Sequence, residues 1–182
     1  NGFKMMLGGD TLAGPVIQEL LAAIEADRFT RPATKGSVTE KDISAEYRNY
    51  IVGHVKLKRP MKIIIDTGNG VGGAFAGALY RALGNEVTEL FSEVDGTFPH
   101  HHPDPSKPKN LQDLIAALKN SDAEIGLAFD GDADRLGVVT KDGNIIYPDR
   151  QLMLFSQDVL SRNPGAKVIF DVKSTRLLAP WI

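Results

Sequence analysis

Between residues 60 and 129, short apolar runs alternate with segments of helical periodicity, and this alternation constrains the fold more than any other feature. We expect strands at 61–66, 86–91 and 124–129, and helices at 71–83 and 111–119. Buried apolar strands separated by helices are typical of a parallel sheet that is covered on both faces. The sequence therefore predicts a doubly wound α/β domain, in which ligands gather beyond the carboxyl ends of the strands.

The flanking segments are less regular. We expect a strand at 3–7, helices at 15–24, 37–55 and 149–162, a hairpin of 136–140 with 145–147, and a strand at 167–172. Ser37 or Thr39 would cap the second of these helices. His54 lies on one face of that helix together with two tyrosines. We interpret His54 as a structural residue, because a lone histidine on such a face is more often packed than a ligand.

The third apolar run ends abruptly in Asp130-Gly131-Asp132-Ala133-Asp134-Arg135. Carboxylates at alternate positions repel one another unless a positive charge lies among them. Hard oxygen ligands suit Mg²⁺, which binds through a few carboxylates and completes its shell with water or phosphate. Gly131 permits the tight turn that aims all three carboxylates at one point. The motif predicts a divalent-metal loop for phosphate chemistry, with Asp130, Asp132 and Asp134 as ligands.

An acidic segment of this kind also has two other interpretations. An EF-hand loop beginning at Asp130 requires Gly at its sixth position and Glu at its twelfth. Arg135 and Lys141 occupy these positions, so the EF-hand is excluded. A solvated acidic turn between two strands is the remaining alternative, because turns favour Asp and Gly. We favour the metal site, since a turn rarely needs three acids in register directly after a buried strand.

Composition narrows the possible partners. The formal net charge of -2 over 182 residues gives no indication of attraction to nucleic acid or a membrane surface, and we expect neither partner. The absence of cysteine excludes thiolate catalysis and zinc–thiolate sites and is compatible with a cytoplasmic location. No apolar run approaches the about 20 residues of a membrane span, and we expect no signal peptide.

A glycine-rich loop, Gly68 to Gly73, supports a competing function. It follows a predicted strand, opens a predicted helix and satisfies G-x-G-x-x-G, the pattern of a dinucleotide-binding turn. Glu89 lies about 20 residues further on, where a ribose-binding acid could sit. Asp66 and Asn69, however, crowd the loop with polar groups where the phosphates would approach. We keep an NAD-binding oxidoreductase domain as the alternative, and a tight strand-to-helix turn as the structural interpretation.

A second polar segment contains three consecutive histidines, His100 to His102, between prolines. Three imidazoles could bind a transition metal, but consecutive side chains of an extended chain point in opposite directions. The prolines favour such an extended backbone. We therefore interpret this segment as a rigid, polar surface loop.

Taken together, the motifs resemble those of the α-D-phosphohexomutases, the phosphoglucomutase/phosphomannomutase superfamily, and most of all its bacterial bifunctional branch. The resemblance extends over the whole chain in the expected order. The matching segments are Asn1-Gly2-Phe3-Lys4, Asp66-Thr67-Gly68-Asn69-Gly70, Glu93 to Pro99, His101 to Pro105, Gly126 to Arg135, Tyr147-Pro148-Asp149-Arg150 and Asp171 to Arg176. One variation is Ala133, where many members have Gly, and we expect this small side chain not to block the metal.

The resemblance implies a phosphomutase activity. Such enzymes have four domains around a cleft and interconvert hexose 6-phosphate and hexose 1-phosphate, here of mannose and glucose, through a phosphoserine and a 1,6-bisphosphate. By this resemblance Asp130, Asp132 and Asp134 would hold Mg²⁺. Lys4 and Arg135 would be catalytic. Arg135, Arg150 and Lys173 would bind the substrate.

The resemblance also implies that the chain is a fragment. Residues 1–58 would be the end of domain I, 59–147 domain II with the metal loop, and 148–182 the start of domain III. The family's serine lies in a Ser-His-Asn-Pro loop just before Asn-Gly-Phe-Lys, and no serine of this chain matches that motif. We expect the fragment to be inactive alone, and the parent enzyme to be a monomer.

Overall fold

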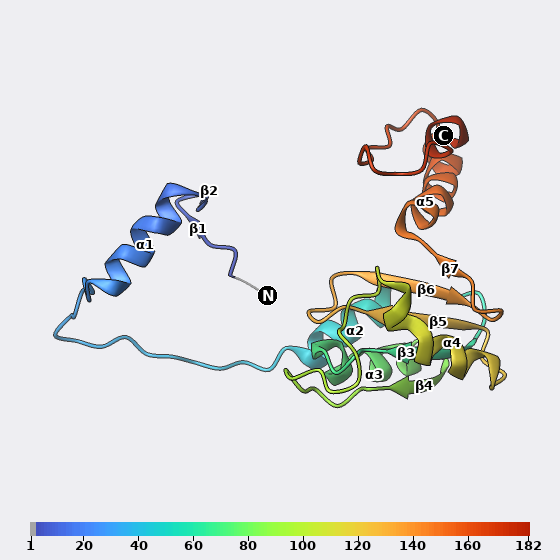
Figure 1. Ribbon diagram of the computed structural model, residues 1–182, viewed down its shortest axis with the longest axis horizontal. Helices are drawn as coiled ribbons and strands as arrows, with labels where there is room; N and C mark the ends of the chain where they lie inside the picture. The colour runs from blue at the N-terminus through green and yellow to red at the C-terminus, as the bar shows by residue number, and fades with distance from the viewer. Residues whose placement is uncertain (1–2) are drawn as a thin grey trace. The chain divides into compact units, whose positions relative to one another are not determined.

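The computed structural model describes residues 3–182, which divide into two compact units, the first ending at Asp42 and the second beginning at Ile43 (Figure 1). In the first unit, β1 (Met6–Leu7) pairs antiparallel with β2 (Asp10–Thr11), and α1 (Pro15–Glu25) follows. The predicted helix is confirmed and begins with Pro15, whose missing N–H costs nothing at that position. The predicted strand at 3–7 is shorter than expected.

The second unit is built on a five-stranded sheet in the order β4-β3-β5-β6-β7. Its strands are β3 (Lys62–Asp66), β4 (Glu86–Leu90), β5 (Ile125–Phe129), β6 (Leu136–Thr140) and β7 (Ile145–Ile146). β3 pairs parallel with both β4 and β5, whereas β5–β6 and β6–β7 are antiparallel. The three parallel strands therefore end at one edge of the sheet, as the sequence predicted, and the hairpin is confirmed.

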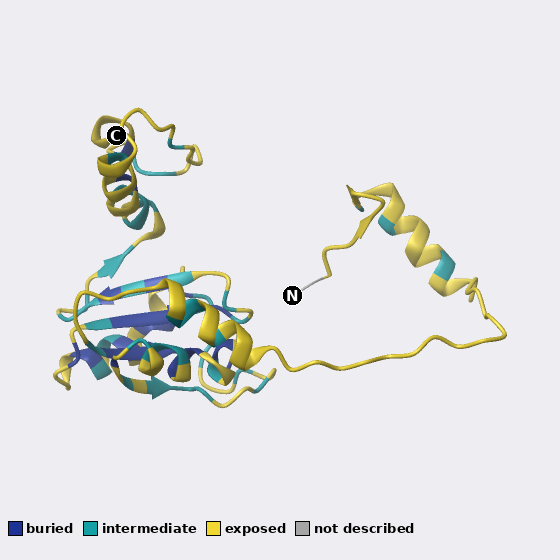
Figure 2. Ribbon diagram, turned by 180° about the vertical axis from the view of Figure 1, so that it is seen from behind, coloured by how far each residue is buried: buried dark blue, intermediate teal, exposed yellow. Residues whose placement is uncertain are grey.

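Helices cover both faces of this sheet, and the side chains of β3 alternate between them. Ile63 and Ile65 pack with Ala76 on one face, whereas Ile64 packs with Leu114 on the other. Figure 2 shows the buried residues concentrated on these strands, while the first unit is exposed almost throughout. The three-layer arrangement confirms the predicted α/β class.

The helices that pack over the sheet are shorter than the sequence indicated. The helices over the sheet are α2 (Ser44–His54), a 3₁₀ turn at Val71–Ala74, α3 (Ala76–Ala82), a 3₁₀ turn at Pro108–Leu111 and α4 (Gln112–Lys119). The prediction that α2 starts at Ser37 was wrong. Residues 37–43 are exposed at the boundary between the two units along the chain, and without packing a helix turn has little stability. His54 is structural here: its Nδ1 lies 2.7 Å from the Tyr50 carbonyl oxygen.

The last part of the chain contains α5 (Pro148–Arg162) and the short α6 (Leu178–Trp181). The predicted helix at 149–162 is confirmed, but the predicted strand at 167–172 is absent from the described residues. Ile169 and Val172 are 92% and 96% exposed, so this apolar run has no neighbouring strand to pair with. A strand needs such a partner for its backbone hydrogen bonds.

At the opposite edge of the sheet from the strand ends, Arg59 and Glu124 form an ion pair that predicts a pH dependence of stability. Arg59 Nη1 donates to Glu124 Oε1 at 2.9 Å, and this bond, with one from the Lys62 amide, lowers the pKa of Glu124 from 4.5 to about 2. A depressed folded-state pKa stabilises the fold at neutral pH, and this contribution is lost as the pH falls from about 4.5 towards 2. In urea unfolding, Glu124→Gln is expected to be less stable than wild type at pH 7. A difference that persists undiminished at pH 2 would contradict the assignment.

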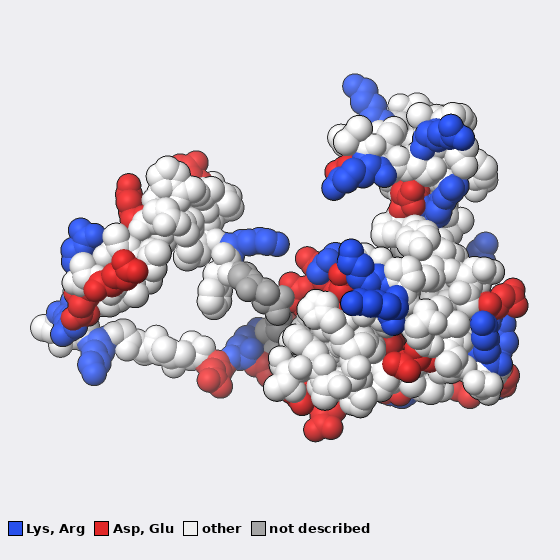
Figure 3. All heavy atoms as spheres, in the orientation of Figure 1, with Lys and Arg blue, Asp and Glu red and all other residues white. Residues whose placement is uncertain are grey.

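Acidic and basic side chains are interspersed over the second unit in the face shown in Figure 3. Among residues 3–182, no helix combines the length and the apolar character needed to cross a membrane.

Candidate metal centre

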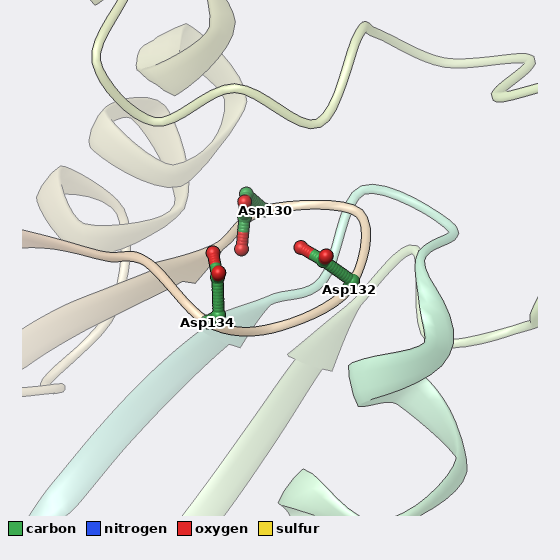
Figure 4. Close-up of side chains that lie close together, drawn as sticks. All are labelled: Asp130, Asp132 and Asp134. Atoms are coloured by element: carbon green, nitrogen blue, oxygen red, sulfur yellow. The ribbon is translucent and has the colours of Figure 1, made fainter. Parts of the chain in front are cut away.

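The loops that follow β3, β4 and β5 meet at one edge of the sheet, and the acidic segment is the loop after β5. One carboxylate oxygen from each of Asp130, Asp132 and Asp134 lies within 4.8 Å of the other two, and the side chains converge in Figure 4. β4 and β5 flank β3 on opposite sides. From β3 the chain goes to one side of the sheet and from β5 to the other. The acidic loop therefore lies at a topological switch point, which is where open α/β sheets bind ligands.

Asp130 is the fixed member of the group. It is fully buried at the end of β5, and its Oδ1 accepts the Arg135 amide at 2.9 Å while its Oδ2 accepts Arg135 Nε at 2.6 Å. Burial opposes its charge, but the hydrogen bonds from Arg135 outweigh burial and lower the pKa of Asp130. The side chains of Asp132 and Asp134 are exposed. Asp130 is therefore ionised and oriented before any cation arrives.

The donor set fits a hard divalent cation. Octahedral Mg²⁺ binds oxygen at about 2.0–2.1 Å, so its ligand oxygens lie about 3–4 Å apart. Small rotations of the two exposed carboxylates bring oxygens within 4.8 Å into that range. Each Asp130 oxygen keeps a lone pair beyond its bond to Arg135. Ala133 between the exposed acids has a φ of 59°, in the left-handed region, which closes the loop.

The acidic loop borders a hollow in the surface of the second unit. This cavity of about 430 Å³ lies between the β6–β7 hairpin and the start of α5, and Asp134 and Arg135 are among its lining residues together with Tyr147 and Gln151. Of the two exposed carboxylates, that of Asp134 thus lies at the edge of a concave surface.

The glycine-rich loop is a packed turn. The backbone N–H groups of Gly68, Asn69, Gly70 and Val71 all donate within the protein, the last of them to the Gly131 carbonyl oxygen at 3.1 Å. A dinucleotide site needs such N–H groups directed at the phosphates. The structural interpretation of this loop is therefore confirmed.

Glu89 also has a different partner from the one a dinucleotide site requires. Its Oε1 lies 2.6 Å from Arg81 Nη1, and its carboxylate packs against Gly77, where an added Cβ would lie 2.2 Å from the Glu89 carboxyl carbon. It supports α3 against β4. The oxidoreductase alternative has no support in the structure or in the comparisons below.

The histidine segment is a surface loop, as the sequence predicted, with His100 and His102 exposed, but His101 is largely buried. His101 Nε2 lies 3.1 Å from Oδ2 of the buried Asp66, and His100 Nδ1 lies 2.7 Å from Asn69 Oδ1. The His100 ring stacks on Phe91 at 4.1 Å. The histidines therefore fasten their loop to the glycine-rich loop. The sequence contains one indication of this contact: Asp66 ends a strand predicted to be buried, and a buried carboxylate needs a hydrogen-bond donor.

The other predicted site residues lie elsewhere in the chain. Lys4 is exposed in the first unit. Arg150 and Lys173 are exposed in the second unit, at the start of α5 and in the loop before α6. Asp149 joins their two segments, because its Oδ2 accepts the Thr175 amide at 2.9 Å. The roles of Lys4, Arg150 and Lys173 stay predictions.

The fold and the site define a three-layer α/β protein with an acidic loop at the carboxyl edge of its sheet. A family model described as phosphoglucomutase/phosphomannomutase, α/β/α domain II, matches residues 45–143. This match covers more than half of the chain. The chain belongs to the phosphoglucomutase/phosphomannomutase family.

Individual proteins show the same relationship. A phosphoglucomutase of Neisseria meningitidis serogroup A is 85% identical over all of this chain, which covers 40% of that protein. A phosphomannomutase/phosphoglucomutase of Pseudomonas putida is 57% identical, with 39% of it covered. The crystal structure of a phosphoglucomutase/phosphomannomutase family protein from Burkholderia thailandensis superimposes with a TM-score of 0.88 at 59% identity, covering 99% of this chain and 39% of that one. The chain thus spans about two fifths of the length of these relatives.

Proposed function

We propose that this chain is part of a longer phosphohexomutase that interconverts hexose 6-phosphate and hexose 1-phosphate through a phosphoserine and a 1,6-bisphosphate. The observation that carries the proposal is the convergence of three carboxylates at the sheet edge in a member of this family. The similarity to a phosphoglucomutase and to a phosphomannomutase/phosphoglucomutase supports glucose and mannose phosphates as substrates. On this proposal, residues 1–58, 59–147 and 148–182 belong to domains I, II and III.

Mg²⁺ is the proposed cofactor, and Asp130, Asp132 and Asp134 would hold it. When bound, such a cation offsets negative charge on a transferring phosphoryl group. The serine that carries this group would belong to the part of the longer protein outside this sequence, since no serine here has the family's Ser-His-Asn-Pro context.

The chain's own cations have complementary proposed roles. Arg135 orients Asp130 through its backbone amide and guanidinium, and its exposed side chain is free to contact a phosphate as well. Its pKa is raised, first by the hydrogen bond to Asp130, so it stays charged throughout the physiological range. Lys4 would assist proton transfer beside the phosphoserine. Arg150 and Lys173 would bind substrate phosphate as charge-assisted donors.

We also infer a cytoplasmic location, because phosphorylated hexoses are charged and cross bilayers poorly. The parent is proposed to act as a monomer, without nucleic-acid or membrane partners.

Activity assays on two proteins test the proposal: this 182-residue chain, and the longer protein that contains it. With Mg²⁺ and glucose 1,6-bisphosphate present, the longer protein is expected to convert glucose 1-phosphate to glucose 6-phosphate and to carry one phosphoserine by mass spectrometry. The 182-residue chain alone is expected to turn over nothing. Turnover by the chain alone, or full turnover of the longer protein in excess EDTA, would contradict the proposal.

A further inference from the structure

A buried histidine–aspartate contact joins the loop after β3 to the loop after β4. Asp66, the last residue of β3, is fully buried, and its Oδ1 accepts the Gly68 amide at 2.9 Å. His101 Nε2 lies 3.1 Å from Asp66 Oδ2 and 3.2 Å from Oδ1. The side chain of His101 is 14% exposed. No role in the proposed reaction uses this pair, although it lies at the same sheet edge as the acidic loop.

The ionised form of Asp66 is stabilised by its two donors, the Gly68 amide and the His101 ring. Burial raises its pKa, while the charge and hydrogen bond of His101 and the Gly68 amide act in the opposite direction. A buried carboxylate with one donor removed is strongly unfavourable, so the two loops are held together wherever Asp66 is ionised. The contact is close: a Cβ added to Gly68 would lie 3.0 Å from His101 Cε1 and 3.0 Å from Pro103 Cβ.

The loops after β3 and β4, which this contact joins, also pack against the acidic loop. A Cβ added to Gly131 would lie 3.4 Å from Pro103 Cγ and 3.7 Å from Phe98 Cζ, so the histidine-containing loop packs along Gly131. From the other side, the Val71 amide of the glycine-rich loop donates to the Gly131 carbonyl oxygen at 3.1 Å. Gly131 lies between Asp130 and Asp132, and its backbone position sets the spacing of their carboxylates.

We propose that His101 and Asp66 are positioning residues for the metal centre: together they hold the backbone of Gly131, through Pro103 and Val71, where the carboxylates of the acidic loop converge. This inference rests on the proposed function for the identity of the site, but its structural content does not require a bound metal. Residues that orient metal ligands without touching the metal commonly change affinity about 10- to 100-fold when they are replaced.

The test uses the 182-residue chain and three variants. His101→Ala removes the donor to Asp66. His101→Gln keeps an N–H donor near the Nε2 position and is the conservative rescue. Val139→Ala is the matched control, because Val139 is fully buried in β6 beneath α4 and its truncation lowers stability without touching the three loops.

The first readout is amide hydrogen exchange in EDTA, which needs no metal. The Ala133 amide donates to the Asp130 carbonyl oxygen at 3.0 Å and the Arg135 amide to Asp130 Oδ1 at 2.9 Å, so both report on closure of the acidic loop. In His101→Ala these amides and that of Val71 are expected to exchange about 10-fold faster relative to those of β6. His101→Gln is expected to restore most of the protection. Val139→Ala is expected to leave the exchange rates of these three amides at their wild-type values, although it lowers the stability of β6.

The second readout is Mg²⁺ affinity by titration calorimetry, well below the unfolding temperature of every variant. We expect His101→Ala to weaken binding about 10-fold or more, and Val139→Ala to leave it unchanged. Wild-type exchange rates in the acidic loop of His101→Ala would overturn the positioning role. Failure of the wild-type chain to bind Mg²⁺ would instead count against the proposed metal centre, and the exchange data would still decide the role of the pair.

Discussion

Asp132→Asn in the longer protein is expected to lower kcat about 100- to 1,000-fold and to leave the fold intact. The amide keeps the size of the side chain but removes a negative charge from a three-carboxylate site. Loss of the bound cation removes several kcal/mol of charge stabilisation from phosphoryl transfer, and each 1.36 kcal/mol is about tenfold in rate. Steady-state kinetics at saturating Mg²⁺ measure the loss. Circular dichroism and urea unfolding check the fold, because Asp132 is exposed.

Asp142→Asn provides the matched control for Asp132→Asn. Asp142 is an exposed aspartate in the turn between β6 and β7, outside the acidic loop, so the same change of charge and shape occurs away from the site. Its kcat is expected to equal that of wild type. If Asp132→Asn and Asp142→Asn had the same kcat, the assignment of Asp132 as a metal ligand would be contradicted.

Gly73→Ala is expected to destabilise the second unit by about 3 kcal/mol, which corresponds to about 6–12 °C in Tm for a chain of this size. An added Cβ would lie 2.0 Å from the Ser92 carbonyl oxygen and 2.7 Å from its carbonyl carbon. These are backbone atoms, so the contact is relieved only by moving the loop after β4 away from the loop after β3. Urea unfolding of the 182-residue chain measures the effect.

The neighbouring Gly72→Ala separates this clash from the general cost of replacing glycine. A Cβ at Gly72 would meet the Ala133 Cβ at 3.4 Å and Thr67 Cγ2 at 3.5 Å, which are ordinary contacts. Both glycines lie in the same 3₁₀ turn. The free energy of unfolding of Gly72→Ala is expected to differ from that of wild type by less than about 1 kcal/mol. Equal stabilities of the two variants would show that the loop after β4 is free to yield at Ser92.

Features encoded by consecutive residues were predictable from the sequence. The isoleucines of β3 indicated a strand buried on both faces, and the strand does separate two core clusters. The spacing of Asp130, Asp132 and Asp134 predicted that their carboxylates converge, because a turn of six residues leaves them few other directions. In both cases the relevant interactions are local, and periodicity and turn chemistry describe local interactions.

Features that depend on distant partners were not predictable. His101 and Asp66 are 35 residues apart, and nothing in either segment alone identifies the other. Glu89 fitted the spacing of a ribose-binding acid, but its partner Arg81 was unknown until α3 was placed on β4. Ile169 and Val172 have strand propensity without a neighbouring strand. Propensity describes what a segment can form, and packing decides what it does form.

The positive φ of 59° at Ala133 limits what can replace this residue. That backbone region is open chiefly to glycine, asparagine and aspartate, since a branched or bulky side chain there is sterically strained. Aspartate would add a fourth negative charge beside three carboxylates that already repel one another. A loop library for engineering cation selectivity would therefore restrict position 133 to glycine, asparagine and the present alanine.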